Sequence, residues 1–116
     1  MGQLDALLQV DGSEFLAAVI VGPQQTILGS YAQVGLDTTT AQAPLVTTQR
    51  IFSSPESLTA LAEMQESVFY DLDGRRLVCR PIIVRGKIYV LIVLTSAEST
   101  YRRTLNKLVK AIEKTL

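Results

Sequence analysis

The chain has 116 residues, 47% of them apolar, and its 11 basic residues balance its 11 acidic ones. This composition excludes an intrinsically disordered chain and disfavours a nucleic-acid-binding protein, which normally carries a large basic excess. No apolar run approaches the ~20 residues that a transmembrane segment needs, so we expect one domain that spans residues 1–116.

The first third of the chain predicts one short helix and two strands. Residues 3–10 place leucines on one helical face. Residues 14–21 are almost entirely apolar and predict a buried strand, which ends at a Gly-Pro turn over residues 22–25. Residues 26–31 are more polar, so we expect a shorter strand at the edge of a sheet.

The middle of the chain predicts a helical segment that prolines interrupt. Asp37 is a good helix cap, but a helix that begins there would hold Pro44 in its interior, where its missing N–H is costly. We therefore expect Pro44 in a first helical turn. Ser54 should cap a second helix, with Pro55 in its first turn.

Three strand-like runs follow, at residues 68–71, 77–84 and 88–94, separated by two turns that contain glycine. The third run is apolar at every position, which predicts a central strand covered on both faces. Pro81 lies within the second run and cannot donate a ladder hydrogen bond, so we expect a bulge there.

The last helix is the clearest in the sequence. Residues 95–98 read Thr-Ser-Ala-Glu, which fits a capping box and predicts the start of the helix. From Tyr101 to Leu116, apolar residues recur at steps of four and three and form one stripe. A separate stripe is basic, and a solvated helix face explains it best, with an acidic partner or a membrane surface as alternatives. The basic residues are Arg103, Lys107, Lys110 and Lys114.

The sequence offers no catalytic constellation. Histidine, the commonest general base and metal ligand, is absent. Asp71 and Asp73 lie two residues apart, but they flank a turn, where Asp is favoured for local hydrogen bonding. A structural turn is therefore favoured over a metal or acid–base pair. We expect no catalytic, cofactor-binding or metal-binding residues.

The single cysteine, Cys79, lies in the middle of a predicted strand and has no histidine to activate it. We therefore predict a buried and unreactive thiol. Because a lone cysteine cannot form an internal disulfide and no signal peptide is evident, we also expect a cytoplasmic protein.

The order of these segments resembles the roadblock/dynein light chain family, as in a small bacterial or archaeal single-domain member. No single motif is specific, and the ordered set over nearly the whole chain carries the resemblance. One departure is that two prolines interrupt the middle helix, which is usually continuous in the family. The segments that resemble the family are residues 4–8, 15–21, 26–30, 66–70, 77–82 and 88–94, followed by the amphipathic helix.

The resemblance implies an α+β fold with the element order α-β-β-α-β-β-β-α. Its five-stranded antiparallel sheet has the strand order 2-1-5-4-3, with the middle helix on one face and the terminal helices on the other. It also implies a non-enzymatic homodimer that regulates or scaffolds a small Ras-like GTPase. A profilin-like or PAS-like small-molecule sensor is the alternative, and it requires an enclosed pocket between the sheet and the middle helix.

The dimer implied by the resemblance forms through the third strand and the middle helix. That strand would lie at a sheet edge and carries two adjacent aromatic residues with no proline or lysine to protect it, so a second copy would cover an aggregation-prone surface. The predicted interface residues are Leu45, Val46, Ile51, Phe52, Val68, Phe69 and Tyr70.

Overall fold

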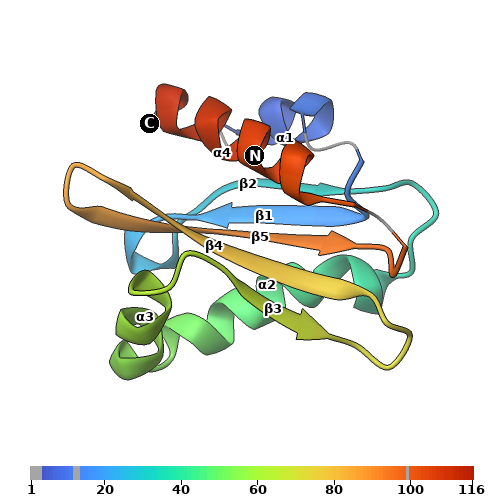
Figure 1. Cartoon of the computed structure of the whole chain (residues 1–116), viewed down its shortest axis with the longest axis horizontal. Helices are drawn as coiled ribbons and strands as arrows, with labels where there is room; N and C mark the ends of the chain where they lie inside the picture. The colour runs from blue at the N-terminus through green and yellow to red at the C-terminus, as the bar shows by residue number, and fades with distance from the viewer. Residues whose placement is uncertain (1–3, 12–13, 99) are drawn as a thin grey trace.

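A computed structural model describes residues 4–11, 14–98 and 100–116. It contains one five-stranded antiparallel sheet in the order β2-β1-β5-β4-β3, with helices on both faces (Figure 1). The predicted fold class and strand order are therefore confirmed. The elements are α1 (Asp5–Asp11), β1 (Ala17–Val21), the short 3-10 helix η1 (Pro23–Gln25), β2 (Ile27–Ala32), α2 (Thr38–Phe52), α3 (Pro55–Ala62), β3 (Ser67–Tyr70), β4 (Arg76–Val84), β5 (Lys87–Thr95) and α4 (Arg102–Thr115).

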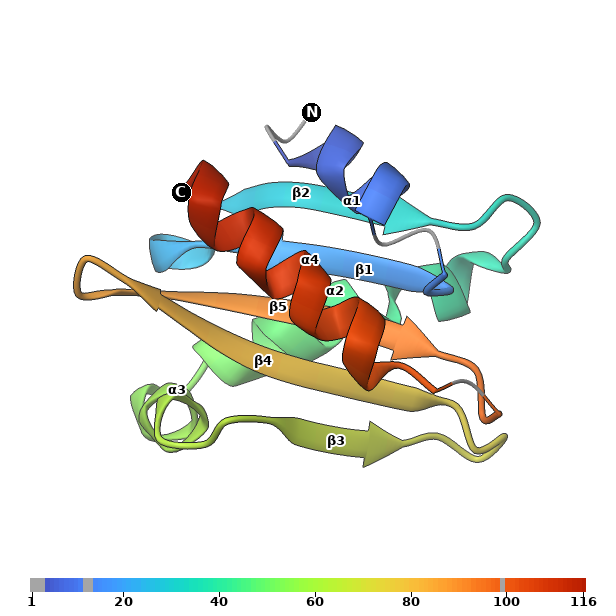
Figure 2. The same cartoon turned by 45° about the horizontal axis from the view of Figure 1, so that its top comes forward.

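The sheet separates two apolar cores. The helices α1 and α4 lie side by side on one face, and α2 covers the other face (Figure 2). Alternating residues of the central strand β5 serve the two cores: Leu91 and Val93 contact the α1/α4 side, whereas Val90 and Ile92 contact the α2 side. The prediction that this apolar strand is covered on both faces is confirmed.

The helix α2 differs from the prediction, because Pro44 lies inside it rather than in its first turn. Asp37 fixes the helix start: its carboxylate accepts hydrogen bonds from the Thr40 N–H at 3.0 Å and from the Thr40 hydroxyl at 2.6 Å. The Pro44 ring is buried, and this burial and the strong cap offset the lost helical hydrogen bond. The predicted cap of α3 is confirmed, since the Ser54 hydroxyl accepts a hydrogen bond from the Ser57 N–H at 3.3 Å.

The predicted capping box of the last helix is wrong. Thr95 is the last residue of β5, where it is buried and pairs with Arg76. Its hydroxyl donates a hydrogen bond to the Ser96 carbonyl at 3.3 Å, and the residue lies well before the helix start. The helix α4 begins at Arg102, with Tyr101 at its cap position and no side-chain cap. The sheet register thus overrides the local capping signal.

The predicted bulge at Pro81 is also wrong, because β4 pairs with β5 in one constant register from Arg76 to Val84. The Asp71 N–H donates to the Arg75 carbonyl at 2.9 Å, so the odd-numbered residues of β4 direct their backbone groups toward β3. The pairing with β3 ends at Cys79. The Pro81 nitrogen therefore faces a side of β4 where the ladder has already ended, and no ladder hydrogen bond is lost.

Candidate interaction surface

The strand β3 is the exposed edge of the sheet, and within the described ranges no further strand pairs with it (Figure 2). Phe69 is 49% exposed and Tyr70 is 72% exposed. Val68 is half-buried and packs against the core beneath α1 and α4. Because side chains alternate along a strand, Phe69 faces the α2 side and Tyr70 the α4 side. The edge thus carries aromatic surface on both faces of the sheet.

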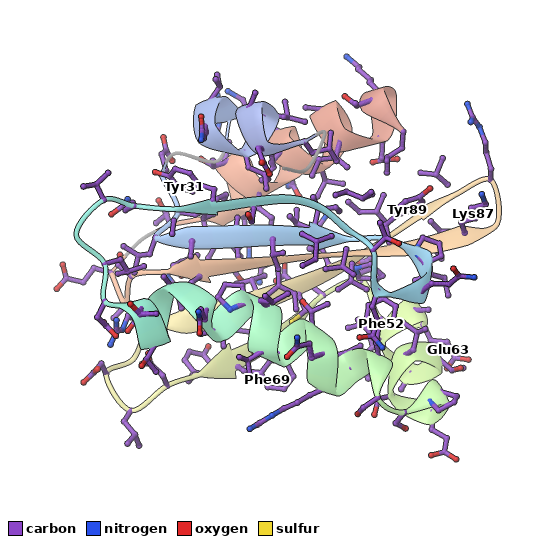
Figure 3. The ribbon with its side chains drawn as sticks, turned by 180° about the vertical axis from the view of Figure 1, so that it is seen from behind. Tyr31, Phe52, Glu63, Phe69, Lys87 and Tyr89 are labelled. Carbon is purple, nitrogen blue, oxygen red and sulfur yellow. The ribbon has the colours of Figure 1, made fainter. Side chains whose placement is uncertain are left out.

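An apolar groove of about 530 Å³ lies beside this edge, between β3 and the helices α2 and α3. Phe69 and Ile51 both line it, so the structure brings these two predicted interface residues together. Figure 3 shows Phe69 beside α2 and Phe52 near α3. Leu61 and Met64 also line the groove, and Met64 is 52% exposed. Sequence periodicity missed this role of Met64, because the residue lies beyond the end of α3.

The predicted interface residues of α2 divide into two groups. Val46 is 43% exposed. Leu45, Ile51 and Phe52 are half-buried and pack against the chain's own α2-side core. These three side chains therefore stabilise the domain itself, and Val46 is the most exposed of the four predicted residues on this helix.

Glu66 anchors the start of β3, a role that the sequence did not signal. One carboxylate oxygen lies 3.3 Å from an Arg80 nitrogen. The other accepts a hydrogen bond from the Tyr101 hydroxyl at 3.0 Å and lies 3.5 Å from an Arg102 nitrogen. Burial and the Glu66 hydrogen bond raise the pKa of Tyr101. The edge strand is thereby tied to β4 and to the first turn of α4.

The turn after β3 is held by Asp71, as predicted. Its carboxylate accepts hydrogen bonds from the backbone N–H groups of Asp73 at 2.9 Å and Arg75 at 2.8 Å. The Arg75 guanidinium lies 3.0 Å from Asp71 and 2.7 Å from Asp73, and the Asp73 hydrogen bond raises the pKa of Arg75. Both carboxylates therefore contact the same arginine and close a turn, in which Gly74 has φ +82°.

The described part of the chain holds no group of three or more metal-ligating side chains, and none of its helices is long and apolar enough to cross a membrane. Cys79 is fully buried, as predicted, and this burial raises the pKa of its thiol to about 12. Its lack of reactivity stays a prediction.

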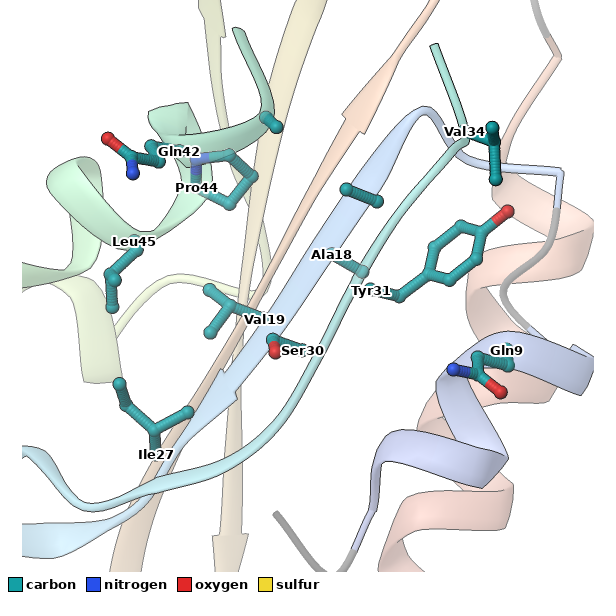
Figure 4. A pocket seen from close by; sticks show the side chains of 12 residues that line it. Gln9, Ala18, Val19, Ile27, Ser30, Tyr31, Val34, Gln42, Pro44 and Leu45 are labelled. Atoms are coloured by element: carbon teal, nitrogen blue, oxygen red, sulfur yellow. The ribbon is translucent and has the colours of Figure 1, made fainter. Parts of the chain in front are cut away.

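A second hollow, of about 640 Å³, lies around the β2 edge of the sheet, beside α2 (Figure 4). Pro44 and Leu45 of α2 line one side, and Tyr31 of β2 lines the other. Its rim includes Ile27 and Val34, which are 47% and 105% exposed. This hollow has the volume of a small-molecule site, but it is open to solvent and extends around the sheet edge, so it is not the enclosed pocket between sheet and middle helix that the sensor alternative requires.

No family model matches the chain, and no curated protein does. Solved structures do resemble it. The gliding protein MglB from Thermus thermophilus superposes with a TM-score of 0.70 at 11% identity, over 94% of this chain and 84% of that one. MglB of Myxococcus xanthus superposes with a TM-score of 0.62 at 18% identity, over 96% of this chain and 89% of that one. A Roadblock/LC7 domain from Streptomyces avermitilis superposes with a TM-score of 0.58 at 17% identity, over 88% of this chain and 85% of that one. This likeness establishes the fold as that of a Roadblock/LC7-like domain.

Proposed function

Because the chain has the Roadblock/LC7 fold, we propose that it is a non-enzymatic, cytoplasmic interaction module, formed by residues 1–116 as one domain. It acts as a homodimer that regulates or scaffolds a small Ras-like GTPase. The observation that carries this proposal is the unpaired β3 edge, where Phe69 and Tyr70 are exposed beside an apolar groove. Such an edge favours pairing with another strand unless something covers it.

In the proposed dimer, β3 pairs with β3 of a second copy and extends the sheet across a two-fold axis. Antiparallel pairing of two identical strands places this axis perpendicular to the sheet, so both copies of α2 lie on one face. Val46 and Phe69 then become buried, as does part of the groove. This surface packs over side chains of each copy's own core, namely Leu45, Ile51 and Phe52. The paired strand also includes Val68 and Tyr70.

The GTPase partner is supported by the resemblance of the segments and by the fold, and not by a catalytic set. Two of the similar structures are MglB proteins, one of them described as a gliding protein. The one thiol of the chain is buried, and its turn carboxylates are held by Arg75, so neither offers a reactive group to a partner.

The test of the dimer is light scattering at micromolar concentration on the wild type and on two matched variants. Phe69→Lys places a charge at the proposed interface, and Val34→Lys places the same charge on the fully exposed Val34, away from it. We expect a dimer for the wild type and for Val34→Lys, and a monomer for Phe69→Lys. A wild-type monomer at this concentration contradicts the dimer.

The test of the partner is an affinity pull-down from the native cell extract, followed by mass spectrometry. We expect the wild type to recover a small GTPase. If the chain is a dimer that recovers none, the interaction module stands and its assignment to GTPase regulation is wrong.

A small-molecule sensor is the second candidate, and the open hollow beside α2 and β2 is the place where its ligand would bind. Native mass spectrometry of the protein purified from its own cells separates the two functions. A bound small molecule that is absent from the Ala41→Phe variant would favour the sensor. Protein that carries no small molecule would favour the interaction module.

A further inference from the structure

A row of four cations runs along the outer face of α4, and we call it the cation row. Its members follow at steps of four, three and four, so they share one side of the helix, over about 16 Å of its length. All four side chains are exposed, and the apolar stripe of Leu105, Leu108 and Ile112 occupies the buried side. The cation row consists of Arg103, Lys107, Lys110 and Lys114.

The charges of the row are not neutralised. Among the described residues, Arg75, Arg80 and Arg102 form ion pairs within 4.0 Å, and no member of the row takes part in these pairs. The acids of this face include Glu113 on the same helix and Glu14, which accepts a hydrogen bond from the Thr104 hydroxyl at 2.7 Å. The neighbouring helix α1 adds Asp5 and Asp11 and contains no basic residue. The helix α4 holds five basic residues and one acidic residue in a chain whose net charge is zero. The positive charge is therefore gathered on the outer side of α4.

The stability of the helix does not explain the whole row. A helix favours cations near its C-terminus, which accounts for Lys114, and anions near its N-terminus. The first turn of α4 nevertheless contains no acid and two arginines. Arg102 has a structural role, because it pairs with Glu66 and lies 5.6 Å from the centre of the Tyr101 ring. Arg103 has neither contact, and it extends the row where the helix dipole opposes it.

We propose that the cation row binds the surface of an anionic lipid membrane. Protein interfaces are usually centred on large apolar or aromatic anchors and are poor in lysine. The exposed side of α4 has no such anchor, and three of the four cations are lysines. Lysine is a hydrated point charge, which suits a diffuse negative surface better than a shaped pocket. Each cation near such a surface contributes about 1 kcal/mol, or roughly fivefold in affinity.

The proposed dimer doubles this surface, and only this step rests on the proposed function. The helix α4 lies on the face of the sheet opposite to α2 (Figures 1 and 2). The same two-fold axis that places both copies of α2 on one face places both cation rows on the other. A dimer therefore presents two cation rows on the same side to one membrane, and its affinity for the membrane exceeds that of a monomer.

The test is co-sedimentation with vesicles of phosphatidylcholine, with and without 30% phosphatidylserine, at about 25 mM salt. Lys107→Gln combined with Lys110→Gln removes two charges from the row. Arg85→Gln combined with Lys87→Gln removes two exposed charges from the β4–β5 turn and gives the same net charge. We expect the wild type and the control to bind the anionic vesicles, and the row variant to bind roughly 25-fold more weakly. Added salt at about 0.5 M should release the protein, because it screens exposed charges.

Three results would overturn the proposal: equal binding to the two kinds of vesicle, no binding to either, or equal losses in the row variant and its control. Loss of an acidic protein from the pull-down of the row variant, with vesicle binding unchanged, would assign the row to that protein instead. Light scattering on the same variants reports the dimer separately. A failure of membrane binding with the dimer intact leaves the proposed function in place.

Discussion

The two edges of the sheet are built in opposite ways. At the β2 edge, the start of α1 covers the backbone: the Leu4 N–H donates to the Leu28 carbonyl at 2.8 Å, and the Asp5 carboxylate accepts the Ser30 N–H at 2.8 Å. Gly29 lies between these bonds, and a Cβ there would come within 2.8 Å of the Leu4 carbonyl carbon. Within residues 4–11, 14–98 and 100–116, nothing pairs with the β3 edge, which exposes aromatic side chains.

This difference determines what kind of assembly the chain can form. A sheet with two open edges can add copies at both ends and grow into a fibre. Here the start of α1 occupies the β2 edge at Leu28 and Ser30 and disfavours the pairing of a further strand, so strand pairing is directed to β3. Pairing of β3 with itself consumes that edge and closes the assembly at two copies. The closed edge therefore matters for the proposed dimer as much as the open one.

The largest effect is expected from blocking the backbone of the open edge. The even-numbered residues of β3 direct their N–H groups away from β4, so Tyr70→Pro removes an outward N–H and leaves the β3–β4 ladder intact. We expect the dimer Kd to rise by at least about 100-fold, equivalent to ~3 kcal/mol. Tyr70→Ala is the matched control, because it removes the same ring and keeps the N–H. Sedimentation velocity over a concentration series measures both, and equal effects would mean that strand pairing does not form the dimer.

The next largest effect is expected at the closed edge. Gly29→Ala forces α1 away from β2, because the added methyl group meets backbone atoms of Leu4 and Asp5. Overpacking of this kind costs about 1–3 kcal/mol, which urea unfolding would detect. Freed from α1, the β2 edge should also support oligomers larger than two. Ser30→Ala, at the neighbouring exposed position, should leave stability and assembly unchanged. If Gly29→Ala is a dimer as stable as the wild type, α1 does not prevent strand pairing at this edge.

A smaller effect is expected from the side-chain cover of the same edge. Asp5→Ala leaves the Ser30 N–H without its carboxylate acceptor, and we expect a loss of about 1 kcal/mol in the free energy of unfolding. Asp5→Asn retains an acceptor oxygen and should recover most of that loss. If both variants unfold at the wild-type urea concentration, the hydrogen bond contributes nothing to the closed edge.

The smallest effect tests whether the open edge frays. Cys79 lies opposite Ser67, the first residue of β3, and its pKa rises from 9.0 to about 12 on folding. The folded state thus holds its proton where the unfolded state releases it, so stability is complete below pH 9 and falls as the pH rises toward 12. At pH 9 the loss is about 0.4 kcal/mol, and Cys79→Ala should abolish this pH dependence. Rapid labelling of the native thiol at pH 7 would show instead that β3 opens.

The sequence predicted those features that follow from local pattern. The apolar run of β5 required cover on both faces, and Ser54 with Pro55 marked the start of α3. The strand order came from the resemblance of the ordered segments, because periodicity alone does not specify which strands are neighbours.

The features that the sequence missed depend on the surroundings of a residue. Whether Pro81 costs a ladder hydrogen bond depends on where β3 ends. Thr95 does not cap α4, because β5 extends to include it. Glu66 is another case, since its partners Arg80 and Tyr101 are distant in the sequence and meet only in the folded chain. Of the predicted interface, the structure shows which side chains are exposed, and the dimer itself stays a prediction.

The pairing of β1 with β5 has a consequence for how the chain folds as it is synthesised. The register joins Ala17 to Leu94 and Val21 to Val90, so the middle of the sheet unites segments separated by more than half of the chain. While the ribosome is still translating the middle helices, β1 and β2 exist as an isolated hairpin, which is marginally stable in water. Closing so long a loop is slow, because its entropy is lost before the contacts form. We therefore expect the nascent chain to expose the apolar flank of β1 until β5 has been synthesised.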